Sequence, residues 1–307
     1  MTATSAGPPY GSSEYYLLYS RDEPALSSAG LELHSLWALD ARGLPSGPLL
    51  VGIDQALRIS SDCSRMIYYA ESVQAPSAWR PSLADLRSLA IQSIDSIRGY
   101  VTMSWSPDGK NIVTDEDYEI SVQDLETGVA RTLTDCRSVP EGPMDCYSPS
   151  WSPDGARIAY YGAIAAPGED PRNGLYLIDP RCANDECVPE GPFPLGEVFS
   201  WSPDGTAIAS AELLSLEIFD VALKQVTETI PVESSGALHR IGSIVWAPDA
   251  SALVFSLDHG MRSVSLRTRE QVLVAAPDSS QPGELLGKVP LAWLRGECLN
   301  RVGSLAE

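Results

Sequence analysis

The hexamer SWSPDG occupies residues 104–109 and returns unchanged at 150–155 and at 200–205. A fourth, altered copy, VWAPDA, stands at 245–250. The tryptophans of these copies, Trp105, Trp151, Trp201 and Trp246, are separated by 46, 50 and 45 residues. A hexamer that recurs at nearly even spacing indicates an internal repeat, in which one supersecondary unit is copied along the chain.

The same phase continues beyond these four copies. Counting back 46 residues from Trp105 reaches Ile59, at the start of ISSDCSRMIYYA, which aligns with WSPDGARIAYYG in the second copy. Counting forward 47 residues from Trp246 reaches Trp293, in PLAWLRGE. Six phase markers, from Ile59 to Trp293, therefore cover most of the chain.

Each repeat contains further segments in which apolar and polar residues alternate. A short apolar run follows the hexamer, and a second segment then ends in aspartate in five of the repeats. These second segments are LWALD, SLAD, ISVQD, LYLID and LEIFD, which end at Asp40, Asp85, Asp124, Asp179 and Asp220, and the sixth, VSLR, which ends at Arg267. Short alternating runs between turns rich in Gly, Pro and Asp predict antiparallel sheet. Four strands in about 45 residues are typical of a β-propeller blade.

The two ends of the chain are predicted to complete one blade between them. Three strand segments, EYYLLYS, ELHSLWALD and GPLLVG, precede Ile59 without a marker-bearing strand, whereas Trp293 opens a repeat that has no further strands. We therefore expect an all-β fold, a six-bladed β-propeller of four-stranded antiparallel blades. Its ring is closed by the C-terminal strand, which pairs with the N-terminal strands and leaves no open sheet edge. Residues 14–307 are predicted to form this single domain, after a flexible tail at 1–13.

The hexamer itself is predicted to be structural. Proline and glycine suit a tight turn, the aspartate can accept hydrogen bonds from nearby backbone N–H groups, and the tryptophan buries apolar area between blades. Because the aspartate is the constant part of the copies, it is a poor candidate for a catalytic group. The residues assigned to this structural repeat are Trp105, Asp108, Gly109, Trp151, Asp154, Gly155, Trp201, Asp204, Gly205, Trp246, Asp249 and Trp293.

WSPDG followed by a β segment at this spacing resembles the TolB-like propeller repeat, the WD40-like repeat family with a Pro-Asp core. The resemblance covers Ile59 to Trp293 and, through the shared blade, almost the whole chain. It implies a periplasmic propeller that recruits protein partners. Related blades also form the gating domain of prolyl-oligopeptidase-like peptidases and occur in some lyases, so the resemblance is more specific for fold than for function.

Charge narrows the range of partners. The 307 residues carry a formal charge of −20, with 21 Lys and Arg against 41 Asp and Glu. Nucleic acids and anionic lipids need cationic patches, so neither is an expected partner. The acidic stretches at 115–119 and 168–172 could accept a basic peptide, and the central channel could hold Ca²⁺, although a solvated acidic surface explains the charge as well. No apolar run is long enough to span a bilayer, and we expect a monomer.

The cysteines form a pattern that favours disulfides. They are Cys63, Cys136, Cys146, Cys182, Cys187 and Cys298. Cys136 and Cys146 bracket one short segment, and Cys182 and Cys187 bracket a shorter one. Neither pair has the spacing of a zinc ribbon. We hypothesise that Cys63 and Cys298 are bonded to each other. Disulfides persist in oxidising compartments, so we expect an exported protein, periplasmic or extracellular, whose signal has been removed. Six reduced thiols in a cytosolic protein are the alternative.

Motifs for catalysis are missing from the sequence. It has no GxSxG elbow, Gly-rich phosphate loop, HExxH or EF-hand loop, and we assign no catalytic residue. The three histidines, His34, His239 and His259, are expected near one face of neighbouring blades. They would form a metal or acid–base cluster if their imidazoles lie within reach of one ion. Three unrelated surface histidines are the alternative.

One side of the blades is expected to carry the long connections. The segments at 20–33, 71–79, 136–148, 162–173, 228–242 and 276–288 all fall on the side opposite the SPDG turns. Function concentrates in such loops on a rigid scaffold, so we expect a non-catalytic exported scaffold that engages a protein or peptide through this side and the central channel. A carbohydrate or other small ligand bound by Tyr100, Tyr147 and Trp79 is one alternative, and a propeller lyase or hydrolase is another.

Overall fold

The computed structural model describes most of the chain between its two ends. The described residues are 15–26, 32–40, 44–53, 58–72, 75–94, 97, 101–138, 143–164, 172–182, 187–233, 240–257, 260–275, 288–295 and 298. For some strand residues, among them Trp79 and Trp293, the backbone alone is described.

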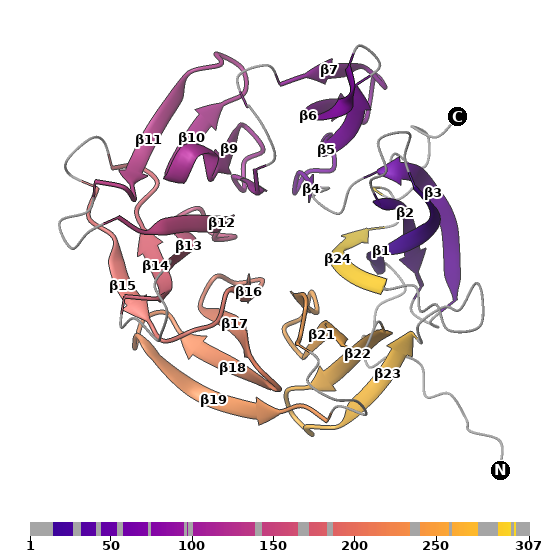
Figure 1. Cartoon of the computed structure of the whole chain (residues 1–307). Coiled ribbons are helices and arrows are strands. Elements are labelled where there is room, and N and C mark those ends of the chain that lie inside the picture. Colours follow the sequence, from indigo (N-terminus) through magenta and orange to yellow (C-terminus); the bar gives the residue numbers. More distant parts are fainter. Residues whose placement is uncertain are drawn as a thin grey trace. The chain divides into compact units, whose positions relative to one another are not determined.

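The fold is an all-β, six-bladed β-propeller, as predicted, and each blade is a four-stranded antiparallel sheet (Figure 1). Blade 1 consists of β24 (Lys288–Arg295), β1 (Tyr15–Leu26), β2 (Glu32–Leu39) and β3 (Pro45–Ile53). Blade 2 consists of β4 (Arg58–Ile59), β5 (Arg65–Ser72), β6 (Ala75–Asp85) and β7 (Ile91–Ser93). Blade 3 consists of β8 (Met103–Trp105), β9 (Asn111–Thr114), β10 (Glu119–Asp124) and β11 (Ala130–Asp135).

The other three blades follow in chain order. Blade 4 consists of β12 (Asp145–Trp151), β13 (Ile158–Ala163), β14 (Gly174–Ile178) and β15 (Glu190–Phe193). Blade 5 consists of β16 (Val198–Trp201), β17 (Ala207–Glu212), β18 (Ser215–Asp220) and β19 (Gln225–Pro231). Blade 6 consists of β20 (Ile244–Trp246), β21 (Ala252–Leu257), β22 (Gly260–Ser265) and β23 (Gln271–Ala275). A short 3-10 turn, η1 (Glu116–Tyr118), lies between β9 and β10. Within the described part of the chain, no helix has the length and apolar character needed to cross a membrane.

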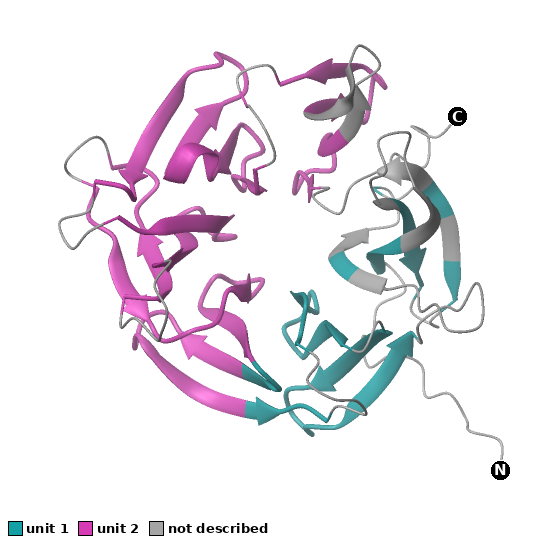
Figure 2. Cartoon of the chain, in the orientation of Figure 1, with its two compact units in different colours: residues 1–55, 213–216, 230–307 teal, residues 56–212, 217–229 magenta. Residues whose placement is uncertain are grey.

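The strands fall into two compact units (Figure 2). Unit 1 comprises Met1–Gln55, Leu213–Leu216 and Ile230–Glu307, and holds blades 1 and 6. Unit 2 comprises Ala56–Glu212 and Glu217–Thr229, and holds blades 2, 3 and 4 with most of blade 5. In unit 1, β24 pairs with β1 and Trp293 lies opposite Leu17, so the C-terminal strand completes the N-terminal blade, as predicted.

The repeat phase is visible in the strand pairing. In blades 2 to 6 the phase marker on the first strand lies opposite the residue seven positions later, on the second strand. These pairs are Ile59 with Met66, Trp105 with Ile112, Trp151 with Ile158, Trp201 with Ile208 and Trp246 with Leu253. Ile59 therefore occupies the same position in its blade as the four tryptophans do in theirs.

The SPDG turns share one hydrogen-bond pattern. In blades 2 to 5 the serine hydroxyl donates to Oδ1 of the aspartate two residues later, at 2.6–2.8 Å. The same Oδ1 accepts from the backbone N–H of the residue after the glycine position. Glycines 109, 155 and 205 have φ of +68° to +73°, and Cys63 takes their position in blade 2 with φ +55°. The degenerate copy at Ile59 is thus a true repeat, identified by its turn.

A second turn joins the third and fourth strands and uses the aspartates that end the third strands. Oδ1 of Asp85 and Oδ1 of Asp124 each accept from the backbone N–H groups two and three residues later, at 2.7–2.9 Å. In blade 6 the equivalent residue is Ser265, whose N–H donates to the carbonyl oxygen five residues later, as that of Asp85 does. The alignment of Arg267 with the aspartates is therefore wrong by two residues, because β22 ends at Ser265.

Two of the segments predicted to be long loops are strand over most of their length. β1 continues to Leu26, and β5 and β6 are separated only by residues 73–74, so the predictions at 20–33 and 71–79 are wrong in this respect. Among the described residues, the outer part of the β5–β6 hairpin pairs only within itself, as in Glu71 opposite Trp79. The described residues of β4 and β7 pair nearer to the other end of this hairpin. A two-stranded ribbon needs no buried face, so its polar sequence looks like that of a loop.

Neighbouring blades pack face to face within each unit. In unit 2 the indole N–H of Trp105 donates to the Arg58 carbonyl oxygen at 3.2 Å, and that of Trp201 donates to the Ser150 carbonyl oxygen at 3.1 Å. These tryptophans therefore both fill the apolar layer between blades and bond one blade to the next. In unit 1 an apolar cluster joins β1 and β2 of blade 1 to β21 and β22 of blade 6.

All six cysteines are disulfide-bonded. The predicted bonds Cys136–Cys146 and Cys182–Cys187 are confirmed, with Cα–Cα distances of 6.1 and 5.1 Å. The two remaining cysteines, at 63 and 298, are disulfide-bonded as well, which gives three disulfides in the chain.

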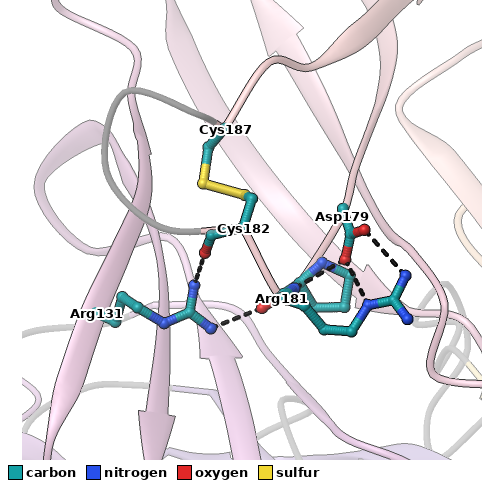
Figure 3. Close-up of a disulfide and its surroundings, with 6 residues drawn as sticks. Arg131, Asp179, Arg181, Cys182 and Cys187 are labelled. Carbon is teal, nitrogen blue, oxygen red and sulfur yellow. Dashed lines mark hydrogen bonds and ion pairs between the residues drawn. A yellow bond between two sulfur atoms is a disulfide. The ribbon is translucent and has the colours of Figure 1, made fainter.

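The Cys182–Cys187 disulfide lies in the turn between β14 and β15 (Figure 3). The Arg131 guanidinium, from β11, donates to the carbonyl oxygens of Cys182 and Pro180, the latter at 2.6 Å. In the same turn the hydrogen bond from the Arg181 side chain is the main cause that lowers the pKa of Asp179 to about 2. The turn is therefore fixed by a covalent bond and by an arginine of the preceding blade.

Candidate functional site

Connections of blades 3 and 4 form a pocket of about 620 Å³ in unit 2. We call it the Tyr118 pocket, and its lining residues are Tyr118, Arg137, Pro143, Met144, Asp145, Ile164 and Arg172. Tyr118 is the last residue of η1. Arg137, Pro143 and Met144 belong to the connection between β11 and β12, and Asp145 is the first residue of β12. Ile164 and Arg172 belong to the connection between β13 and β14. Three of the segments singled out in the sequence, 115–119, 136–148 and 162–173, therefore meet here.

The pocket combines apolar side chains with three charges. Pro143, Met144 and Ile164 supply the apolar part of the lining. The guanidinium carbon of Arg137 lies 4.1 Å from the centroid of the Tyr118 ring, which is a cation–π contact. Among the described lining residues, two arginines and one aspartate give a formal charge of +1, in a chain whose net charge is −20. The described part of the lining thus differs in charge from the acidic composition of the chain.

The Cys136–Cys146 disulfide holds one wall of the pocket. It encloses residues 137–145, which include four of the lining residues. Cys136 and Cys146 are buried, at 0% and 4% exposure, in the apolar core between blades 3 and 4. The N–H of Met144 also donates to the Cys136 carbonyl oxygen at 2.9 Å. This wall is therefore anchored to the core at both ends.

A partly buried carboxylate, Asp115, lies directly before η1. Its oxygens accept the N–H of Thr102 at 2.7 Å, the hydroxyl of Thr102, and the N–H of Ser148 at 3.0 Å. Burial is the largest influence on the Asp115 carboxyl and raises its pKa, although the hydrogen bonds act in the opposite direction. Asp115 thus joins the end of β9 to β12, the first strand of blade 4, beside the pocket.

Three residues with positive φ lie at or beside the pocket. Nine described residues other than glycine have positive φ. Six of these stand in tight turns between strands of the blades: Cys63 and Ala250 in SPDG-type turns, Leu89, Lys224 and Arg269 between third and fourth strands, and Leu213 between β17 and β18. The other three are Asp117 (+53°) and Tyr118 (+68°) in η1, and Ser148 (+57°), which donates to Asp115. Such strain persists only where the surroundings enforce it, and it often accompanies functional sites, so two consecutive strained residues in η1 support the choice of this pocket.

Tyr147, predicted to be a binding residue, lies on β12, two residues after the pocket residue Asp145. Its ring centroid is 5.4 Å from that of Tyr161, and its hydroxyl donates to Oε2 of Glu197 at 3.0 Å. Burial first, and then the negative charge of Glu197, raise the pKa of both tyrosine hydroxyls. We call Tyr147, Tyr161 and Glu197 the Tyr147 cluster. Two half-buried rings beside a carboxylate can stack on a flat ligand and accept hydrogen bonds from its hydroxyls.

The other predicted site residues lie mostly outside the described chain. His239, His259 and Tyr100 are not among the described residues, nor is the side chain of Trp79. His34 lies inside β2, in the segment predicted to be a strand, and is 6% exposed. Among the side chains that are described, no group of three His, Cys, Asp or Glu could hold a metal ion. The histidine cluster stays a prediction.

No family model and no curated protein matches the sequence. Among solved structures, the chain is similar to one in the nidogen/laminin complex, with 12% identity, coverage of 91% of this chain and 98% of that chain, and a TM-score of 0.59. It is also similar to an oligogalacturonate lyase from Vibrio parahaemolyticus, with 14% identity, coverage of 86% and 80%, and a TM-score of 0.55. An oligogalacturonate lyase in complex with manganese gives 14% identity, coverage of 87% of both chains, and a TM-score of 0.54. At these identities the likeness shows the propeller fold alone.

None of the seven lining residues is among the site residues predicted from the sequence, and Tyr118, Arg137 and Arg172 supply the ring and the positive charges of the pocket. Tyr118 and Arg172 stand in the two stretches that the sequence presents as acidic, 115–119 and 168–172. In the structure both contribute to a pocket lined by more positive than negative charge. The signal available in the sequence was the aromatic or basic residue inside each acidic stretch, together with an arginine directly after Cys136.

Proposed function

We propose that this protein is a non-catalytic, exported scaffold that binds a protein or peptide partner through the Tyr118 pocket and the connections around it. The observation that carries the proposal is the convergence of three connections on one pocket, whose backbone is strained and whose wall is clamped by a disulfide. Loops held in one conformation before binding lose less entropy on association. Such loops on a rigid scaffold are a common location of binding function.

Two further observations support this proposal. Three disulfides favour an oxidising compartment, periplasmic or extracellular. One of the similar structures is a complex of two proteins, nidogen and laminin. The resemblance of the repeat to TolB-like propellers, which implies recruitment of protein partners in the periplasm, agrees with both. Membership of the TolB-like family is part of the same proposal.

Selection of peptides tests the proposal directly. Peptides would be enriched from a random displayed library on the purified, oxidised protein, and their affinities measured for the wild type and for Tyr118→Ala. We expect Tyr118→Ala to weaken the enriched peptides about thirtyfold, as for an aromatic hot spot. The matched control is Val129→Ala, an apolar side chain that is 65% exposed in the turn between β10 and β11. If enriched peptides bind Tyr118→Ala as tightly as the wild type, or if none is enriched, the proposal is wrong.

The Tyr147 cluster favours a second candidate function, the binding of a carbohydrate. Two tyrosine rings and a carboxylate provide stacking surface and acceptors in one place, and two of the similar structures are, by their names, oligogalacturonate lyases. A glycan array followed by titration of Tyr147→Ala and Tyr147→Phe tests this candidate. We expect the alanine variant to lose binding and the phenylalanine variant to retain most of it. An array without ligands would count against it, as would a Tyr147→Ala variant with unchanged affinity.

A further inference from the structure

We propose that the Tyr118 pocket selects a carboxylate that stands beside a large apolar side chain. Two sources share this chemistry: an Asp or Glu side chain next to an apolar residue, and the C-terminal carboxylate of an apolar residue. The proposal rests on the binding function proposed above and names the ligand chemistry of the same pocket.

The pairing of the cations in unit 2 points to Arg137 as the group that receives the carboxylate. Within the described chain, four other cations lie within 4.0 Å of a carboxylate: Arg87, Arg157, Arg181 and Lys224. Arg137 has no such ion pair among the described residues, and the same is true of Arg65, Lys110 and Arg131. Of these four cations, Arg137 is the one that lines the Tyr118 pocket, where its guanidinium lies over the Tyr118 ring. The N–H groups of a guanidinium lie in its own plane, so a ring stacked on its face leaves the donors at its edge for a planar carboxylate.

The charges of the lining favour an anion over a cation. Among the described lining residues there are two arginines, Arg137 and Arg172, and one carboxylate, Asp145, although the chain as a whole carries −20. Repulsion from distant carboxylates is screened beyond about 8 Å at physiological ionic strength. A guanidinium and a carboxylate in contact are screened much less. The short-range preference of the pocket therefore prevails over the net charge of the chain.

The rest of the lining calls for an apolar group next to the carboxylate. Pro143, Met144 and Ile164 have no charged atoms, and Met144 is only 7% exposed. A volume of about 620 Å³ exceeds that of one carboxylate and suits a ligand with an aromatic or large aliphatic side chain. The cation–π contact between Arg137 and Tyr118 places the charged donor next to an apolar ring. The two residues could therefore bind a carboxylate and the apolar group beside it together.

Three capped amino-acid probes distinguish the possibilities. N-acetyl-phenylalanine carries a C-terminal carboxylate, N-acetyl-glutamyl-phenylalaninamide carries a side-chain carboxylate, and N-acetyl-phenylalaninamide carries neither. Each would be titrated into the ¹⁵N-labelled protein, with the Arg137 side-chain N–H and the Tyr118 and Met144 amides followed by NMR. We expect at least one carboxylate probe to bind about tenfold more tightly than the neutral probe, since a hydrogen bond to a charged group adds that much. The tighter of the two identifies the source of the carboxylate.

Two variants link the preference to Arg137. Arg137→Gln is expected to abolish the tenfold preference while the neutral probe keeps its affinity within about twofold, because the uncharged side chain offers no charge-assisted bond. Arg181→Gln is the matched control, since that arginine is exposed in the turn between β14 and β15 and does not line the pocket. Arg137 is itself exposed, so Arg137→Gln should fold, and an unchanged melting temperature checks this.

The possible failures of the two proposals differ from each other. If all three probes bind the pocket equally, or if Arg137→Gln keeps the preference, the carboxylate proposal is wrong and the binding function stands. If the probes shift signals elsewhere and the selected peptides ignore Tyr118→Ala, both proposals are wrong.

Discussion

Removal of the Cys136–Cys146 disulfide tests whether the pocket depends on its covalent clamp. The perturbation is the double substitution Cys136→Ala with Cys146→Ala. The bond joins residues with a sequence separation of 10, for which the entropy of loop closure in the unfolded chain corresponds to about 2.7 kcal/mol at 25 °C. The matched control is Cys182→Ala with Cys187→Ala. Its separation of 5 gives about 2.1 kcal/mol by the same relation.

Burial adds to the difference between the two variants. Cys136 and Cys146 lie in the core between blades 3 and 4, whereas Cys182 and Cys187 are only partly buried. Each buried sulfur that is removed costs roughly 1 kcal/mol in lost transfer energy and cavity formation. We therefore expect a loss of about 4–5 kcal/mol for the first variant and of about 2 kcal/mol for the second.

Urea unfolding followed by tryptophan fluorescence measures both losses, because Trp105 and Trp201 lie in the apolar layers of unit 2. The affinity of a peptide selected on the wild type measures the pocket. The first variant should lose stability and pocket affinity, and the second should lose stability alone. The reasoning is refuted if the second variant is the less stable of the two, or if the first binds the peptide as well as the wild type does.

Three further predictions concern single positions. Ala250→Gly should raise the free energy of unfolding by about 1 kcal/mol, and Gly109→Ala should lower it by as much. Both positions have positive φ, +56° and +68°, and a Cβ at position 109 would meet other atoms only at ordinary contact distance, so the backbone conformation decides the effect. Urea unfolding measures both changes. Arg131→Met should lower the free energy of unfolding by about 2 kcal/mol, because the carbonyl oxygens of Pro180 and Cys182 lose their hydrogen-bond donor. An unchanged urea midpoint would contradict this. Burial raises the pKa of Asp115 above its ordinary value of 3.8, so its contribution to stability is fully present below that value and is lost as pH rises through the folded pKa. The stability of the wild type relative to Asp115→Asn should therefore fall as the pH rises above 3.8, and a difference that does not change with pH would argue against this assignment.

The fold could be predicted because the residues that mark the repeat act locally. The Ser–Asp–backbone bonds of an SPDG turn close within six residues, so a copy of the turn marks a copy of the hairpin. This holds even where Cys63 replaces glycine, since Asp62 keeps the same bonds. Prediction fails where pairing alone decides the structure. The ribbon at 71–79 and the end of β22 are set by register, which leaves little trace in a polar sequence.

The candidate site could be predicted only in part. The segments 136–148 and 162–173, predicted to be long connections, both contribute to the pocket, and Tyr147, predicted to be a binding residue, lies on β12 two residues after the lining residue Asp145. The character of the pocket was not predictable, because Tyr118, Arg137 and Arg172 come from three connections that meet only in the folded blades. Charge along the sequence suggested an acidic rim, whereas the described lining residues include two arginines and one aspartate.

Positive φ occurs both in the repeated SPDG turns and in the segments beside the Tyr118 pocket, but on different residue types. In three of the SPDG-type turns glycine takes the positive φ, which glycine adopts readily because it has no Cβ. The three positive φ values of η1 and β12 fall instead on Asp117, Tyr118 and Ser148, which gain nothing from such a conformation. They are stabilised by Asp115, which accepts the Ser148 N–H, and by the disulfide at the start of β12. A scaffold would not need either device to form its blades, since the other blades form without them, so their effect is to hold Tyr118 and its neighbours in one arrangement.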